Sequence, residues 1–430
     1  MGFFRKTWDA SALRRRAADG TYWLRIVLLI VLGMALAQVL AGFDWWRAAT
    51  YSTYGTLLRL SQSPLKYPSR TAVVIIDDDD FWHGEWARRS PIKRATLARL
   101  IRQIETASPL VIAIDIDLRA QTPDGSFLTH PDYEGETNEL LGAITQVAQR
   151  IPVVLPKTIG FDTAAQQFVV DADVFDHKPL GPNVAAGYTM IPSDLRNLAL
   201  PTHVDGHPVS SLAAAAASFV DPESVVVAQE RGHRSLPYSM FLGREAYDKK
   251  TVCARDVLAG QPRALATLKN RVVVVGGRWH RDAYGRGELI DQHLTPVGML
   301  SGVLVHANYI EALLTQRTFS PSYHWVHYAA DALVGISLAA IFIAVRSKWK
   351  VLYLIVLAVI VALSSVVAFQ NLGTIFDGVP VVVLLGAHAA YETILEWKRG
   401  HDAWKRGDRG DNAQKYYPSA SGGTGAETPA

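Results

Sequence analysis

Cysteine is almost absent from this chain of 430 residues: Cys253 is the only one, so no disulfide within the chain can stabilise it. The chain also lacks a Gly-x-x-x-x-Gly-Lys phosphate loop, a His-Glu-x-x-His metal motif and a Gly-x-Ser-x-Gly nucleophile turn. The net charge is only +3, and no basic stretch laced with aromatic residues suggests nucleic-acid binding. These absences argue against a nucleotide-dependent enzyme, the common hydrolases and a nucleic-acid partner. We expect no catalytic residue, bound metal or cofactor.

Long apolar runs are what the chain has in excess, since 49% of its residues are hydrophobic. Each of four runs is about long enough to cross a bilayer whose core is roughly 30 Å thick. Lys and Arg cluster before the first run, between the second and third, and after the fourth, and such residues stay on the cytoplasmic side. The pattern predicts a protein in contact with membrane lipids, with both termini in the cytoplasm and residues 44–323 outside. The predicted transmembrane helices are residues 21–43, 326–345, 351–369 and 375–395, between the cytoplasmic segments 1–20 and 396–430.

The first apolar run has a second interpretation, because Ala35-Leu36-Ala37 resembles the site at which a secretory signal is cleaved. A retained helix is favoured, since the apolar residues continue to Ala41. Trp45, Trp46 and Tyr51 then follow where interfacial aromatic residues usually anchor a chain at the membrane surface. The segment after Gly400 is polar and is expected to be disordered.

Three short apolar segments carry the fold prediction. Val73–Ile76 is a run of β-branched residues, typical of a strand that is buried on both faces of a parallel sheet, and Asp77–Asp80 follows it. Val111–Ile114 ends in the same way at Asp115, and Arg271–Val275 is followed by Gly276-Gly277 and then Asp282. If these strands are parallel neighbours, their carboxyl ends meet at one edge of the sheet, where such folds bind ligands.

The segments between these strands predict an α/β fold with a mostly parallel sheet flanked by helices, in addition to the four transmembrane helices. Leu97, Leu100, Ile101 and Ile104 lie at the spacing of one helical face, and this helix would connect two parallel strands. A long polar loop is predicted for residues 121–136. Further helices are expected at residues 138–149, 209–220 and 303–314, and a strand at residues 224–228.

The candidate ligand-binding residues are the acidic side chains at the predicted edge: Asp77, Asp78, Asp115 and Asp282. Neighbouring residues on a strand point to opposite faces, so at most two of the four residues Asp77–Asp80 can share a site. They could hold a divalent cation, contribute to a small-molecule pocket, or only cap a turn. Asp115 and Asp282 could bind a polar ligand or accept local backbone hydrogen bonds.

Two histidines are weaker candidates. His306 begins the predicted helix at residues 303–314, where local hydrogen bonds are a simpler explanation for it than a ligand. His388 falls within the fourth apolar run, one turn before Glu392. An ionisable group at membrane depth is a functional candidate, but packing against Asp331 or a partner protein explains His388 equally well.

Three blocks of this sequence resemble the second class of CHASE domains, extracytoplasmic sensory domains of bacterial cyclases and histidine kinases. Ile75–Asp78 with Arg94 resembles the first strand and arginine-led helix of that family, and Val111–Asp115 resembles its second strand. The closing block is the most specific. It comprises Leu268–Gly276, Asp282, Thr295-Pro296, Gly302 and His306-Ala307-Asn308, approached by Asp256–Leu258 and Gly260.

The resemblance spans roughly residues 8–397 and includes the plan of one helix before the domain and three after it. It departs from the family at Trp86–Pro91, where a Pro- and Trp-rich turn is usual, and in the run of four Asp. Nothing in the chain resembles the usual cytoplasmic output domain.

The resemblance implies a bacterial inner-membrane sensory protein whose periplasmic domain detects a small-molecule or envelope signal. A cytoplasmic or membrane partner would have to read the response, with residues 398–406 as the expected contact, and a homodimer is possible. Two alternatives remain open. One is an envelope hydrolase in which Asp77, Asp115 and Asp282 hold a metal ion, and the other is a membrane scaffold that senses nothing.

Overall fold

The computed structural model of the chain divides into two compact units. One comprises residues 1–40, 324–361 and 376–430, and the other comprises residues 41–323 and 362–375. The residues that the structure describes are 20–40, 42–61, 67–89, 91–119, 133–162, 167–204, 207–231, 238–285, 287–319, 329, 332–337, 347–372 and 398.

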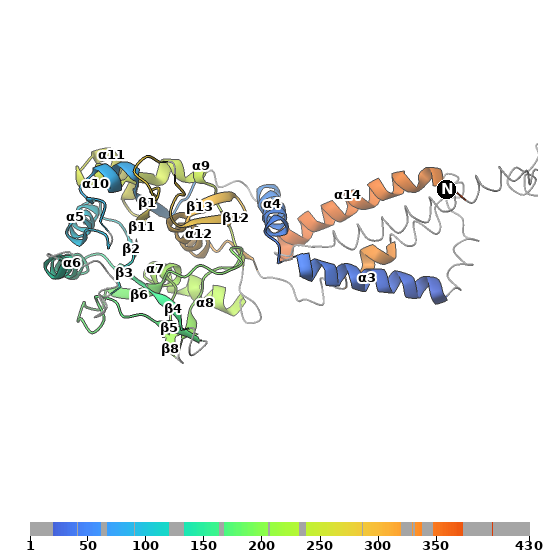
Figure 1. Ribbon diagram of the computed structural model, residues 1–430, viewed down its shortest axis with the longest axis horizontal. Helices are drawn as coiled ribbons and strands as arrows, with labels where there is room; N and C mark the ends of the chain where they lie inside the picture. The colour runs from blue at the N-terminus through green and yellow to red at the C-terminus, as the bar shows by residue number, and fades with distance from the viewer. Residues whose placement is uncertain are drawn as a thin grey trace, which may run out of the picture. The chain divides into compact units, whose positions relative to one another are not determined.

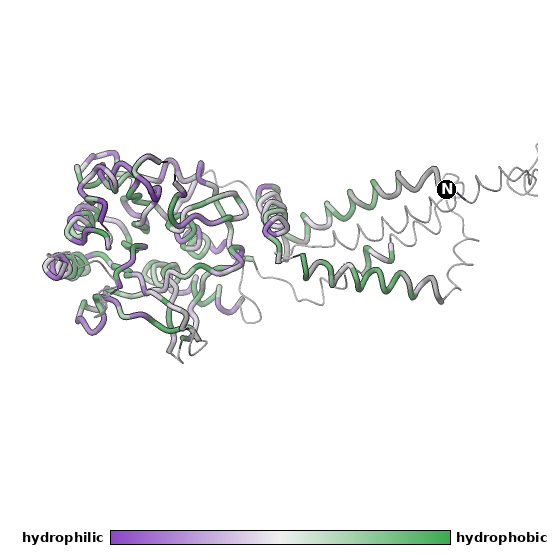
Figure 2. The backbone as a smooth tube through the Cα atoms, viewed as in Figure 1, coloured by the Kyte–Doolittle hydropathy of each residue, from purple (hydrophilic) through white to green (hydrophobic). Residues whose placement is uncertain are grey.

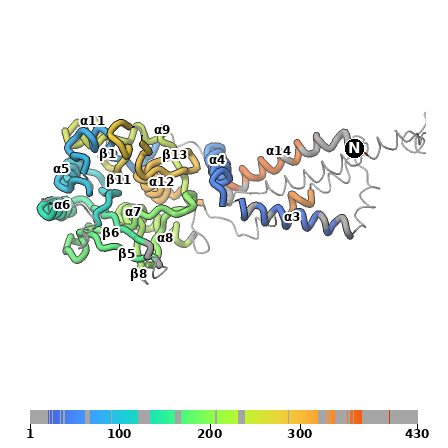
Figure 3. The backbone as a smooth tube through the Cα atoms, in the orientation of Figure 1, coloured from blue at the N-terminus to red at the C-terminus, as the bar shows by residue number. Residues whose placement is uncertain are grey.

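A six-stranded parallel sheet forms the centre of the second unit (Figure 1). Its strands lie in the order β10-β1-β11-β2-β3-β6, so segments from the beginning and the end of the unit are neighbours, as the colours of Figure 3 show. The mostly parallel sheet expected from the sequence is therefore confirmed. The strands are β1 (Thr71–Ile76), β2 (Val111–Asp115), β3 (Val153–Lys157), β6 (Val184–Tyr188), β10 (Thr251–Cys253) and β11 (Val272–Gly277).

The three strands predicted from apolar runs, β1, β11 and β2, are adjacent and parallel. Ile75 pairs with Gly276, and Gly276 pairs with Asp115, so the three strands end at the same level. Two glycines end β11 because a Cβ on Gly276 would lie 2.7 Å from Val303, and a Cβ on Gly277 would collide with the ring of Trp279. The absence of side chains at Gly276 and Gly277 therefore allows Val303 and Trp279 to pack closely against the end of β11.

Helices cover both faces of the sheet (Figure 1). Alternate residues of β1 serve the two cores: Val73 and Ile75 pack on one side, while Val74 and Ile76 pack on the other. Neither face of the sheet is left to solvent, which explains why the strands are continuous apolar runs. The first face packs against α4 (Asp44–Ser61), α7 (Leu212–Ser218), α8 (Pro222–Arg231) and α12 (Gly302–Leu314), and the second against α5 (Arg94–Glu105), α6 (Tyr133–Val147), α10 (Ala254–Leu258) and α11 (Pro262–Leu268).

Short elements complete the unit, and most are antiparallel pairs. The turn after β1 contains a π-helix, η1 (Asp79–His83), and a short α9 (Arg244–Tyr247) and 3₁₀ helix η2 (Asp248–Lys250) precede β10. The pairs are β4 (Ile159–Asp162) with β5 (Gln167–Val170), β7 (Thr202–Val204) with β8 (His207–Val209), β9 (Tyr238–Ser239) with β14 (Thr318–Phe319), and β12 (Gln292–Thr295) with β13 (Gly298–Ser301).

The predicted strand at residues 224–228 is wrong, because this segment lies in α8. Pro222 starts the helix, Asp221 accepts a hydrogen bond from the backbone N–H of Ser224, and Val225 and Ala228 are buried at helical spacing. The predicted helix at residues 303–314 is confirmed as α12. The predicted loop at residues 121–136 falls mostly outside the described residues, although α6 already begins at Tyr133.

Two of the predicted membrane segments are helical: α3 (Gly20–Leu40) and α14 (Ser347–Leu372). Among the described residues, no helix combines the length and the apolar character that crossing a membrane requires. The predicted span 375–395, with His388 and Glu392, lies outside the described residues, as does most of 326–345, including Asp331. Tyr51, expected at the membrane surface, is instead buried, and its hydroxyl accepts a hydrogen bond from the backbone N–H of Leu195 at 3.0 Å.

Glu311 fastens the end of α12 to the start of β1. Its carboxylate is fully buried and accepts hydrogen bonds at 2.7–3.2 Å from the backbone N–H groups of Ser69, Arg70 and Thr71, and from the hydroxyls of Ser69 and Thr71. A buried carboxylate with this many donors holds two elements firmly together. Because of it, we expect α12 and the sheet to move as one body.

Candidate functional site

A pocket of about 790 Å³ opens at the carboxyl ends of the central strands. This is the edge at which open parallel sheets bind ligands. Its walls come from the turn after β1, the ends of β2 and β11, the segment after β6, the approach to β12, and α12. We call it the rim pocket; it is lined by Phe81, Trp82, Arg88, Arg89, Pro91, Ile92, Asp115, Ile116, Asp117, Thr189, Ile191, Gly277, Trp279, Arg281, Ile290, Asp291 and His306.

The floor of the rim pocket holds a buried carboxyl group and a buried imidazole. The side chain of Asp115 is 12% exposed and that of His306 is 2% exposed, with 3.7 Å between Asp115 Oδ1 and His306 Nε2. Burial raises the pKa of Asp115 to about 6, although His306 opposes the shift. Among the described residues, the buried His306 Nδ1 has no hydrogen-bond partner, and the 3.7 Å between Asp115 Oδ1 and His306 Nε2 is too long for a hydrogen bond. The expected local hydrogen bonds of His306 are therefore not what holds it.

Asp291 lies beside this floor at the amino end of α12. Its side chain accepts a hydrogen bond from His293 Nε2 at 2.7 Å, and a Cβ on Gly302, the first residue of α12, would collide with its carboxylate. Burial tends to raise the pKa of Asp291, but the hydrogen bond and the attraction of His293 and His306 outweigh it, so the pKa is lowered. An anion at this position also interacts favourably with the helix dipole.

An aromatic wall stands on one side of the pocket. The rings of Phe81 and Trp279 are stacked, with centroids 4.2 Å apart and planes 7° apart, and Trp82 packs edge-on against Phe81. Trp82 Nε1 donates a hydrogen bond to the carbonyl of His280, while Asp78 accepts hydrogen bonds from the backbone N–H and ring of His280, both at 2.7 Å. Asp78 thus holds together the two loops that carry the wall.

Three arginines, Arg88, Arg89 and Arg281, line the pocket. Ala87 and Arg88 both have left-handed backbone angles, with φ of 56° and 58°, a conformation that costs non-glycine residues energy. This turn directs Arg88 Nε to the carbonyl of Trp82 at 2.8 Å, and Arg89 forms an ion pair with Glu136. Among the described residues, nothing pairs with the guanidinium of Arg281, which is exposed.

The acidic turn after β1 has its own partners. Asp77 accepts hydrogen bonds from the backbone N–H of Asp80 and from Arg255 Nη1 at 2.7 Å. Asp80 is 2% exposed and accepts the backbone N–H of Arg255. Burial tends to raise the pKa of Asp77, but these hydrogen bonds and the Arg255 charge lower it overall. Burial and the charge of Asp77 raise the pKa of Asp80 to about 6.

The four predicted ligand-binding residues are therefore placed differently. Asp115 lines the rim pocket, whereas Asp77, Asp78 and Asp282 do not. Asp77 pairs with Arg255, Asp78 binds His280, and Asp282 accepts the backbone N–H of Tyr284. Among the described residues, no group of three or more His, Cys, Asp or Glu side chains is arranged to hold a metal ion, so Asp77, Asp115 and Asp282 do not form the acidic centre of the alternative hydrolase.

The remaining polar and aromatic lining residues were not predicted from the sequence. Trp279, Arg281 and Asp291 follow β11 in a polar segment with no period, and only the spacing Asp291-x-His293 signals chemistry there. Arg88 lies within the segment Trp86–Pro91, whose composition departs from the family pattern, and Trp82 lies in the π-helix just before it. The two Trp residues are three residues or fewer from residues that the strand pattern did single out.

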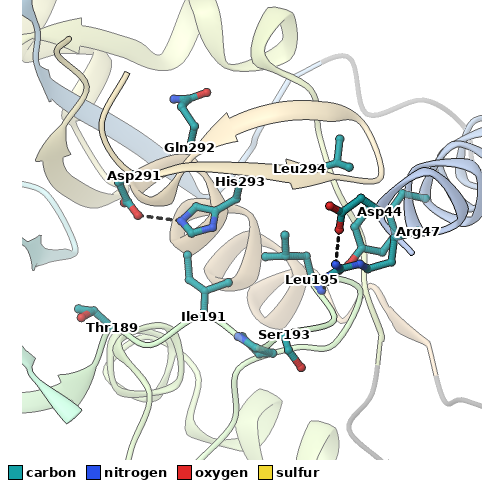
Figure 4. A pocket seen from close by; sticks show the side chains of 12 residues that line it. Asp44, Arg47, Thr189, Ile191, Ser193, Leu195, Asp291, Gln292, His293 and Leu294 are labelled. Atoms are coloured by element: carbon teal, nitrogen blue, oxygen red, sulfur yellow. Dashed lines mark hydrogen bonds and ion pairs between the residues drawn. The ribbon is translucent and has the colours of Figure 1, made fainter. Parts of the chain in front are cut away.

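A second pocket, of about 640 Å³, adjoins the first and shares Thr189, Ile191 and Asp291 with it. We call it the helix pocket, because Asp44, Arg47 and Tyr51 of α4 form one wall and the β12 residues Gln292–Leu294 form another. Figure 4 shows the ion pair of Asp44 with Arg47 on one side and the Asp291–His293 hydrogen bond on the other. The carboxylate of Asp291 thus borders both cavities.

A family model of the CHASE2 domain matches residues 26–345, well over half of the chain. The chain belongs to the CHASE2 family. CHASE2 domains are extracytoplasmic sensory domains, and the six-stranded sheet and the rim pocket lie within the matched residues. No curated protein and no solved structure matches this CHASE2 chain.

Proposed function

We propose that this CHASE2 protein is a sensory component of a bacterial inner membrane, and not an enzyme. In this proposal the domain formed by residues 44–323 lies in the periplasm and binds a small ligand in the rim pocket. The observation that carries the proposal is the floor of that pocket, where the Asp115 side chain is only 12% exposed and has the imidazole of His306, at 3.7 Å, as its charged neighbour among the described residues. A buried polar group without a partner costs free energy, and a bound ligand would remove that cost.

The exposed apolar surface of α3 supports a membrane location. Figure 2 shows that the helix is predominantly hydrophobic, and Leu24, Val27, Leu28, Val31 and Leu32 are each more than half exposed. Exposed apolar surface of this extent is unfavourable in water and favourable in lipid. The charge pattern of the sequence then orients the chain with its termini in the cytoplasm.

The arrangement of the two pockets supports a route for the signal. The rim pocket contacts α12 at His306 and, through Asp291, borders the helix pocket on α4. In the chain, α4 directly follows α3, and the segment after α12 and β14 enters the apolar run 326–345. A ligand that favours one position of Asp291 would therefore act on both connections to the membrane segments, provided its affinity for the two positions differs.

Cysteine labelling tests the orientation. In a Cys253→Ser background, Tyr284→Cys places a thiol at a side chain that is 86% exposed, and Lys398→Cys places one in the predicted cytoplasmic tail. We expect a membrane-impermeant maleimide to label Tyr284→Cys in intact spheroplasts and Lys398→Cys only after lysis. The reverse pattern would refute the proposed topology.

The proposal also requires a partner that reads the signal inside the cell. We expect the full chain, extracted in mild detergent, to retain a cytoplasmic or membrane signalling protein through the basic segment at residues 398–406. Replacing the basic residues of this segment by Gln should release the partner, while Arg263→Gln, an exposed residue on α11, should not. Recovery of the CHASE2 chain alone would count against signalling in trans.

A further inference from the structure

The charged side chains that line the rim pocket differ in their exposure. The carboxyl group of Asp115 is 12% exposed, whereas the side chains of Asp291 and Asp117 are 48% and 47% exposed. The exposed guanidinium groups of Arg88 and Arg281 line the same pocket. The pocket therefore offers one deeply placed carboxyl group, that of Asp115, and two exposed guanidinium groups.

The other carboxylates of the pocket are already paired. Asp117 forms a bidentate ion pair with Arg119, and Asp291 accepts a hydrogen bond from His293. Asp115 has only the imidazole of His306 at 3.7 Å, which is too far for a hydrogen bond. Within the described part of the chain, Asp115 is therefore the acceptor that is left for a donor from outside.

The aromatic wall also favours a positively charged group beside Asp115. Trp279, stacked on Phe81, and Trp82 line the cavity together with Asp115. A cation beside a carboxylate gains further stabilisation from the face of an indole ring. A metal ion does not fit this environment, because the described residues provide no group of three ligands for one.

We propose that the rim pocket binds a zwitterion of the amino-acid type, with its ammonium group at Asp115, its apolar part against the aromatic wall, and its carboxylate at Arg281 and Arg88. This inference rests on the proposed sensory function and names the chemical class of its ligand. A neutral sugar would leave the carboxyl and guanidinium groups of the pocket without a counter-charge.

The probes are the twenty protein L-amino acids, added singly to the full chain in detergent, with thermal unfolding as the first readout. We expect at least one amino acid to raise the unfolding temperature by about 2–4 °C at a tenfold excess over its Kd. Isothermal titration of that amino acid should show Asp115→Asn binding about 30-fold more weakly, the loss expected for a charged hydrogen bond. Its N-acetyl derivative, which has no ammonium group, should not bind the unsubstituted protein.

Matched variants separate a local effect from a general one. Asp282→Asn removes a carboxylate that does not line the pocket and should bind as the unsubstituted protein does. Arg281→Gln should weaken binding about 3- to 10-fold, because its guanidinium is exposed, and Arg263→Gln should have no effect. Equal weakening by Asp115→Asn and Asp282→Asn would overturn the assignment of the floor.

The remaining outcomes also decide the inference. If no amino acid binds, or if glucose or N-acetylglucosamine binds through Asp115 instead, the zwitterion inference is wrong. The proposed function would then still stand on the labelling of Tyr284→Cys and on the partner. If the labelling pattern were reversed but an amino acid still bound, the proposed topology would be refuted and the proposed ligand class would be retained.

Discussion

The ends of β1 and β2 lie at one edge of the sheet, yet their carboxylates have opposite surroundings. At the end of β1, Arg255 contacts both Asp77 and Asp80, and backbone N–H groups donate to both. At the end of β2, Asp115 has His306 Nε2 at 3.7 Å, which is too far for a hydrogen bond. The ionised Asp77, whose pKa is lowered by its donors, stabilises the fold, whereas Asp115, whose pKa is raised, is available for binding at the expense of stability. The acidic run is therefore the structural feature, and the single Asp is the candidate site.

The largest effect should come from Asp115→Asn. The pKa of Asp115 rises from 3.8 to about 6 on folding, so its ionised form destabilises the ligand-free protein by about 3 kcal/mol at neutral pH. We expect Asp115→Asn to raise the free energy of unfolding by up to this amount at pH 7.5, measured by urea denaturation of the full chain with tryptophan fluorescence. A destabilised Asp115→Asn variant would show that the carboxylate is already satisfied.

The next largest effect should come from Arg255→Ala, with the opposite sign. It leaves Asp77 without its ion pair and removes the countercharge of the buried Asp80. We expect a loss of about 2 kcal/mol, kept modest because the Arg255 side chain is 45% exposed. Arg263→Ala is the control, since a surface arginine without such partners should change stability by less than about 0.5 kcal/mol. If Arg255→Ala had the same free energy of unfolding as the unsubstituted protein, the ends of β1 and β2 would not differ in the way described.

The pH dependence of stability sharpens the comparison further. The folded-state pKa of Asp115 is raised, so its destabilising effect is complete above pH 6 and disappears as the pH falls towards 4. His306, Asp291 and His293 face Asp115 and influence this titration. The folded-state pKa of Asp77 is lowered, so its contribution is present above about pH 4 and is lost only on further acidification. Urea denaturation should therefore show the greater stability of Asp115→Asn at pH 7.5 and no such difference at pH 4. A benefit that persists at pH 4 would have another cause.

Much of the fold could be predicted from the sequence because burial on both faces of the sheet leaves a direct mark. Val73–Ile76, Val111–Ile114 and Arg271–Val275 are continuous apolar runs, and the acidic or glycine residues after each mark the same edge. Residues 224–228 were misassigned because a short apolar run fits either a strand or a buried helical face. Asp221 and Pro222, which begin the helix, distinguish the helix from a strand at residues 224–228.

The candidate site could be predicted only in part because its distinguishing feature is the presence or absence of distant partners. Arg255 reaches Asp77 across 178 positions, and His280 reaches Asp78 across 202. The sequence shows four similar carboxylates and does not indicate which of them these side chains satisfy. Asp291 was missed for the same reason, since its importance comes from its place at the start of α12 and between two pockets.

The smallest effect on stability should come from Asp78→Asn. This variant tests whether the hydrogen-bonded turn at the end of β1 supports the rim pocket at the end of β2. Asp78 holds His280, and His280 in turn accepts the indole N–H of Trp82. We expect a loss of about 1 kcal/mol, because the amide can keep one of the two hydrogen bonds and the site is partly exposed. Tryptophan fluorescence should change more than stability does, since Trp82 and Trp279 would lose their fixed positions. If the fluorescence of Asp78→Asn matched that of the unsubstituted protein, the aromatic wall would not depend on the end of β1, and the two regions would be independent.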